Sequence, residues 1–186
     1  MMRVKKIGIL IGSLRKESYN RKIAKHIMEL ATEGLDFKEI KIDNLPFYNE
    51  DLDKEKTPEA YLDFRKSILS LDAILFVTPE YNRSIPAVLK NALDVGSRPY
   101  GKSVWDLKPA AIISSSIGAI GGFGANHHLR QSLVFLNMPC LAQPEAYIGN
   151  ASKLFDKAGK MINEDTDKFL NQFIISFSEW MERFQK

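Results

Sequence analysis

Five short apolar runs of strand length, separated by helical patterns, constrain the fold of this chain more than any other feature. They cover residues 6–12, 37–42, 73–78, 110–116 and a stretch near 146. Most of the runs are continuous rather than alternating, which is typical of strands covered on both faces of a parallel sheet. Because crossovers between parallel strands are right-handed, this pattern predicts an open, doubly wound α/β sheet. We expect five parallel strands in the order 2-1-3-4-5.

Helical periodicity fills the intervals between the runs. The pattern predicts helices over residues 20–33, 58–70, 86–97, 125–137 and 166–185. Thr57 and Pro58 give an N-cap and a first-turn signal for the second of these helices. Residues 43–56 are predicted to form a long polar loop. With 186 residues, 45% of them hydrophobic, the chain is long enough for one well-buried domain over 1–186 and short for two.

Charge and cysteine content exclude several classes of protein. The chain has 26 Lys and Arg against 23 Asp and Glu, and the basic residues are scattered, so nucleic acid is not an expected partner. A lone cysteine, Cys140, excludes a disulfide framework, a cysteine-rich zinc site and a cysteine-ligated iron–sulfur cluster. The first apolar run is too short for a signal peptide, and no run approaches a membrane span. We expect a soluble, cytoplasmic protein with no metal site.

The loop after the first run carries the residues expected of an anion site. Sheets of this type bind ligands outside the carboxyl ends of the strands, where the strand order reverses, so the loops after residues 12 and 78 should face each other. In the first of them, Ser13, Ser18 and Asn20 can donate hydrogen bonds to phosphate oxygens at a helix N-terminus, and Arg15 adds a charged fork. The alternative is that Ser18 only caps the helix and Arg15 is solvated. Spacing alone leaves both open.

The loop after residue 78, TPEYNRSIP, suits a planar ligand. Two prolines predict an extended segment, which would expose backbone N–H and C=O groups to a ring with alternating donors and acceptors, such as a flavin. Tyr81 could line the pocket, while Asn82 and Arg83 could act on a ligand or a partner. The alternative is an ordinary strand-to-helix connection with Asn82 and Ser84 as turn residues.

A third segment, SSSIGAIGGFGANHHLR, combines hydroxyl groups with glycines at the end of the fourth run. Glycine allows a ring or a ribityl chain to pack directly on the main chain, although a mobile loop would have the same composition. The adjacent His127 and His128 point apart in a helix and cannot chelate one metal ion, so we expect surface or interface positions for them. Cys140 is expected to be a buried small apolar residue and not a nucleophile.

Four segments together resemble a known family. They are GSLRKESYNRK, PEYNRSIPAVLKNALD, SRPYGKS and SSIGAIGGFGANHHLRQSLVFLNMP, and in this order and spacing they resemble the NADPH-dependent FMN reductases of the flavodoxin-like superfamily, especially the chromate- and quinone-reducing bacterial branch. The resemblance extends to about residue 150. It implies a homodimer, or a dimer of dimers, that binds FMN non-covalently near the subunit interface and uses NADPH or NADH as substrate.

The resemblance also assigns the binding residues. It places the phosphate loop on Ser13, Arg15, Ser18 and Asn20, the flavin-ring loop on Pro79, Glu80, Tyr81, Asn82, Arg83, Ser84 and Ile85, and the glycine-rich loop on the segment that includes Ser116, Gly118, Gly121 and Gly122. Two positions depart from many relatives, which carry proline at Ile117 and tryptophan at Val95. These departures bear on the shape of the substrate and not on flavin binding.

The implied activity needs no catalytic side chain, because the cofactor carries the redox chemistry. NAD(P)H and then a quinone, free flavin, azo dye or metal oxyanion would react in turn by ping-pong transfer of two electrons. A flavodoxin-type electron carrier is the rival, but this chain lacks both the T/S-x-T-G-x-T-like phosphate loop and the strongly acidic surface usual in flavodoxins. A redox-gated interaction protein is the third hypothesis.

Overall fold

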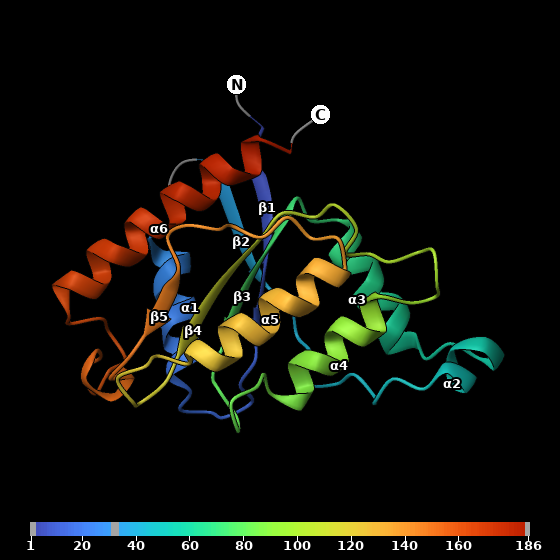
Figure 1. Ribbon diagram of the computed structural model, residues 1–186, viewed down its shortest axis with the longest axis horizontal. Helices are drawn as coiled ribbons and strands as arrows, with labels where there is room; N and C mark the ends of the chain where they lie inside the picture. Colours follow the sequence, from blue (N-terminus) through green and yellow to red (C-terminus); the bar gives the residue numbers. More distant parts are fainter. Residues whose placement is uncertain (1–2, 31–33, 185–186) are drawn as a thin grey trace.

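The computed structural model describes residues 3–30 and 34–184. Within them lies a parallel sheet in the order β2-β1-β3-β4-β5, as the apolar runs predicted. Helices lie on the two sides of this sheet (Figure 1). The strands are β1 (Lys5–Ile11), β2 (Leu35–Glu39), β3 (Ala73–Thr78), β4 (Ala110–Ser115) and β5 (Ala146–Ile148). The second strand ends before its predicted limit, although the following Ile40 and Ile42 are still buried.

Helices cover both faces of the sheet. One face packs against α1 (Tyr19–Glu29) and α6 (Glu164–Glu182). The other packs against α3 (Glu59–Leu69), α4 (Ala87–Gly96) and α5 (Phe123–Phe135). A short helix, α2 (Glu50–Glu55), and one 3-10 turn, η1 (Ala151–Lys153), complete the described elements. Residues 31–33 of the first predicted helix and residue 185 of the last lie outside the described residues.

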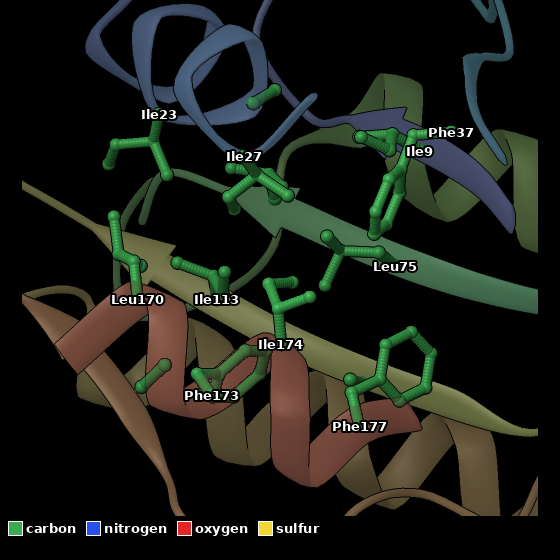
Figure 2. Packing of buried hydrophobic residues seen from close by; sticks show 14 of the residues in the cluster. Ile9, Ile23, Ile27, Phe37, Leu75, Ile113, Leu170, Phe173, Ile174 and Phe177 are labelled. Atoms are coloured by element: carbon green, nitrogen blue, oxygen red, sulfur yellow. The ribbon is translucent and has the colours of Figure 1, made fainter. Parts of the chain in front are cut away.

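Two apolar cores follow from the alternation of side chains along the buried strands. Figure 2 shows the core beneath α1 and α6, where Ile23 and Ile27 of α1 and Phe173 of α6 surround Leu75 and Ile113 of the central strands. The neighbouring strand positions point to the opposite core, which includes Leu10, Ile74, Phe76, Ala110 and Ile112. Burial on both faces explains why the runs are continuous in the sequence. No helix in the described ranges is long and apolar enough to cross a membrane.

The predicted loop over 43–56 is partly wrong, because it contains α2. The Asn49 side chain accepts from the Asp51 N–H at 3.0 Å and caps the helix. Asp53 makes a buried ion pair with Arg65 of α3, at 2.9 and 2.6 Å. This short helix has no buried apolar residue, so an ion pair with the next helix stabilises it instead of an apolar stripe.

The predicted capping role of Thr57 is also wrong. Its Oγ1 donates to the Asp53 carbonyl at 3.0 Å, and so closes the end of α2 instead of opening α3. Pro58 is the N-cap residue of α3, which begins at Glu59, without a side-chain cap hydrogen bond. Proline fits there because it has no N–H to leave unpaired.

Candidate functional site

The loops after β1, β3 and β4 meet at the carboxyl ends of these strands, along the lower edge of Figure 1. They form a half-open cavity of about 180 Å³, which is lined by Ser13, Arg15, Ser18, Tyr19, Asn20, Pro79, Glu80, Tyr81, Ser115, Ser116 and Ile117. Gly12 brings the first two loops together, because a Cβ at this position would lie 2.7 Å from Thr78 Oγ1. The predicted meeting of the first two loops is therefore confirmed.

The first loop builds a polar, buried wall at the start of α1. Ser13, Ser18 and Asn20 are each at most 5% exposed, whereas Arg15 is exposed at the mouth. Ser18 Oγ accepts from the Arg21 N–H at 3.3 Å, so the capping interpretation of Ser18 is correct, but its own hydroxyl hydrogen stays available to a ligand. The Asn20 Oδ1 atom is buried without a hydrogen-bond partner in the described protein.

Ser115, at the end of β4, is a functional candidate that sequence reasoning missed. Its Oγ is buried and likewise has no hydrogen-bond partner among the described residues. The adjacent Ser114 points to the other face, where its Oγ lies 3.3 Å from both the Ala146 carbonyl and Asn126 Nδ2. The sequence holds a signal for Ser115, because neighbouring side chains of a strand point to opposite faces. Of Ser114 and Ser115, only one can therefore face the crevice that also contains Ser13.

These residues fit FMN. A buried polar atom without a partner usually costs about 1–3 kcal/mol, and two of them in one cavity indicate a ligand that supplies the missing hydrogen bonds. Hydroxyl and amide groups beside a helix N-terminus suit a phosphate and a ribityl chain. Ligand pockets usually measure about 300–1,000 Å³, so this half-open cavity of about 180 Å³ would hold part of the cofactor and leave the ring near its mouth.

The second loop is not extended as predicted. Asn82 and Arg83 have φ values of 51° and 66°, and the N–H groups of Tyr81 and Ser84 each donate to the other residue's carbonyl at 2.9 Å. This is a tight turn with two left-handed residues at its centre, so the backbone groups expected to face the ring partly satisfy one another. The interpretation of Asn82 as a turn residue is correct.

Two side chains of this loop contact α5. Glu80 Oε2 accepts from the Ala125 N–H at 3.0 Å, and Ser84 Oγ lies 2.7 Å from His128 Nδ1. Arg83 pairs with Glu80 at 3.1 Å and is largely exposed. Of the seven predicted ring-loop residues, Pro79, Glu80 and Tyr81 line the cavity, and Ile85 belongs to the second apolar core.

The glycine-rich loop contributes less to the cavity than predicted. Ser116 and Ile117 line it, whereas Gly118, Gly121 and Gly122 do not. Gly121 and Gly122 have φ values of 65° and 79°. A Cβ on Gly121 would lie 2.5 Å from the Tyr147 carbonyl carbon, and one on Gly122 would lie 3.1 Å from Ser114 Cβ. These two glycines are therefore required by packing on β5 and β4.

The remaining reactive side chains lie apart from the cavity. The His127 ring contacts Phe123 in a tilted arrangement, with ring centroids 4.3 Å apart, and its Nε2 lies 2.8 Å from the Tyr147 hydroxyl. Burial, and then the nearby Glu145, raise the pKa of Tyr147. Burial raises the pKa of the half-buried Cys140 thiol to about 11, which agrees with the prediction that it is not a nucleophile. The described residues hold no cluster of metal-ligating side chains.

Comparisons with known proteins agree with this geometry. Residues 5–153 match the model of the family NADPH-dependent FMN reductase. The chain is 57% identical to a quinone reductase of Pseudomonas putida, over 98% of this chain and 97% of the relative. It is 43% identical to a 2-hydroxy-1,4-benzoquinone reductase of Burkholderia, over 95% of this chain and 96% of the relative.

Solved structures give the same result. FerB from Paracoccus denitrificans, a flavoenzyme NAD(P)H:acceptor oxidoreductase, superimposes with a TM-score of 0.91 and 40% identity over 97% of this chain and 99% of FerB. A flavodoxin from Pseudomonas aeruginosa, with a TM-score of 0.55 and 18% identity, shares the flavodoxin-like fold alone. The chain belongs to the NADPH-dependent FMN reductase family, and is a flavoprotein oxidoreductase that uses FMN and a nicotinamide nucleotide.

Proposed function

We propose that the chain is an NAD(P)H-dependent quinone reductase that also reduces free flavin and similar acceptors. The observation that carries the proposal is the mouth of the cavity, where the side chains of Tyr81 and Ile117 are 49% and 69% exposed. An aromatic and an aliphatic side chain beside the proposed position of the ring give a flat, apolar acceptor a surface to contact. The relatives named as quinone reductases support this choice of substrate.

Each wall of the cavity has a separate task in this proposal. Ser13, Ser18 and the Asn20 amide nitrogen would donate hydrogen bonds to the phosphate, and Arg15 would neutralise its charge. Asn20 Oδ1, which lacks a partner in the described protein, would accept from a ribityl hydroxyl, and the Ser115 hydroxyl would donate to the ribityl chain or the phosphate. When bound, FMN supplies the redox chemistry by accepting a hydride from the nicotinamide and passing two electrons to the acceptor. The other proposed binding residues would form the surroundings of the flavin ring, either by lining the cavity or by holding α5 in place. They are Pro79 to Ile85, Ser116, Gly118, Gly121 and Gly122.

Anaerobic spectroscopy of the purified protein tests this function. NADPH or NADH alone should bleach the flavin absorption in a single two-electron step, and added benzoquinone should restore it. Initial-rate plots at several quinone concentrations should be parallel, because both substrates would use the same open mouth in turn. If neither nucleotide reduces the flavin while a separate reductase does so one electron at a time, the chain is an electron carrier.

We also propose a homodimer, or a homotetramer, located in the cytoplasm. Val134 and Phe135 of α5 are 78% and 86% exposed, which supports contact between subunits on this helix. Light scattering at micromolar concentration should report at least a dimer, and an active monomer would contradict the proposal. Cell fractionation tests the location.

A further inference from the structure

The N-terminus of α5 is capped by a side chain from another loop. Its own N-cap residue, Gly122, is left-handed and provides no side-chain hydrogen bond. The Glu80 carboxylate, 45 positions earlier, accepts from the Ala125 N–H at 3.0 Å. The carboxylate is only 13% exposed and lies at the positive end of the helix, where the helix dipole and the hydrogen bond both favour a negative charge.

Two further features hold the same loop against α5. Gly124 leaves room for the contact, because a Cβ there would lie 2.9 Å from Glu80 Oε2 and 3.1 Å from the Arg83 carbonyl oxygen. One turn later, His128 Nδ1 lies 2.7 Å from Ser84 Oγ. Loop 79–85 is thus attached to one side of the first turns of α5. The glycine-rich loop runs directly into the same turns, so the position of α5 depends on both loops.

We propose that Glu80 is a positioning residue, which sets the spacing between the two loops that flank the flavin ring. Pro79 and Tyr81, which precede and follow Glu80 in the sequence, line the cavity, and so do Ser116 and Ile117 of the glycine-rich loop. The phosphate wall comes from β1 and α1 and does not depend on the Glu80 contact. Glu80 therefore acts on the ring end of FMN and not on the phosphate end. The inference rests on FMN binding and not on the acceptor, so a chain that reduces no quinone leaves it intact.

Comparison of two flavins tests this assignment. Glu80→Ala should weaken FMN and riboflavin by the same factor, up to about tenfold, because the energy of the lost charge-assisted hydrogen bond limits the cost of the loop displacement that the flavin must reverse on binding. Glu80→Gln keeps an oxygen acceptor for the Ala125 N–H and should recover much of the loss. Glu164→Gln is the matched control, because it removes a carboxylate that is 87% exposed in the first turn of α6, and it should bind both flavins like the wild type.

Gly124→Ala tests the same contact from the helix side. The added Cβ displaces the Glu80 carboxylate without removing any polar group, so both flavins should again lose affinity equally. If Glu80→Ala does not fold, Gly124→Ala alone tests whether the contact between Glu80 and α5 affects flavin binding. Unchanged binding of both flavins in Gly124→Ala would overturn the proposal. So would a loss confined to FMN in any of these variants, because that pattern belongs to the phosphate wall, or a fall in thermal stability with no change in flavin binding.

Discussion

Removal of the Ser115 hydroxyl should stabilise the protein without cofactor and weaken the complex with FMN. Ser115 Oγ is buried and has no partner among the described residues. A buried, unpaired polar group costs about 1–3 kcal/mol, and Ser115→Ala removes it without breaking a described hydrogen bond. The free energy of unfolding of the apoprotein should therefore rise by about 1 kcal/mol or more, which corresponds to roughly 2–4 °C in Tm for a domain of this size.

FMN binding should change in the opposite direction. If the hydroxyl donates to the ribityl chain or the phosphate, its loss removes one neutral hydrogen bond of about 0.5–1.5 kcal/mol, and the Kd for FMN should rise roughly 2- to 13-fold. Thermal melts of apoprotein and of protein with saturating FMN measure the first effect, and quenching of flavin fluorescence measures the second. The variant's advantage in Tm should shrink when FMN is added, because weaker binding gives less stabilisation.

The neighbouring serine is the matched control. Ser114 lies on the same strand, is fully buried and lies within hydrogen-bond distance of the Ala146 carbonyl and Asn126 Nδ2. Ser114→Ala should therefore lower the stability of the apoprotein by about 1 kcal/mol and leave FMN affinity unchanged. If Ser115→Ala destabilises the apoprotein as Ser114→Ala does, the Ser115 hydroxyl has an internal partner and the reasoning fails.

Three other variants or conditions test separate features. Arg15→Ala should weaken FMN roughly 10- to 150-fold, as for a lost charge-assisted contact, and leave riboflavin affinity unchanged; equal losses in fluorescence titrations would remove Arg15 from the phosphate site. Because the pKa of Cys140 is raised to about 11, its alkylation in the folded protein should be slow near neutral pH and should increase as pH rises toward that value; fast labelling at neutral pH would contradict the burial. The Arg65 guanidinium lowers the pKa of Asp53, so their ion pair stabilises the fold fully above the pKa of an unfolded Asp and is lost as pH falls through the lower folded value. Asp53→Asn should lower the free energy of unfolding by about 3 kcal/mol and remove this part of the acid dependence, whereas an unchanged acid titration by circular dichroism would refute the role of the pair.

The sheet and the place of the cavity were predictable because both depend on local patterns. Apolar runs such as 73–78 are continuous because helices cover both faces of the sheet. Burial on both faces is typical of parallel strands. The loops that carry Ser13 and Pro79 had to meet, because parallel strands place their carboxyl ends at one edge. The place of Ser13, Ser18 and Asn20 in the site was predictable because they lie between the end of a strand and the first turn of a helix.

Other parts of the structure depend on side-chain contacts that local patterns do not show. The helix α2 has no buried apolar stripe and is stabilised by the pair of Asp53 with Arg65 of the next helix. The turn at Asn82 and Arg83 lacks the Asn-Gly signal that usually marks two left-handed residues. Nothing in the sequence near Glu80 shows that its carboxylate caps a helix 45 positions later, or that Gly121 is required by β5.

The arrangement of α6 has a consequence for the order in which this protein can fold during synthesis. The C-terminal part of α6 lies against the start of the first strand, where Lys5 Nζ donates to the Ser178 carbonyl across 173 positions. Contacts between such distant segments form late, because closing the intervening chain is entropically unfavourable. A growing chain therefore completes its three ligand loops before it makes α6, which shares one apolar core with Ile7 and Ile9. Until α6 leaves the ribosome, the face of the sheet that it shares with α1 is only partly covered, and the remainder stays open to chaperones and to other nascent chains.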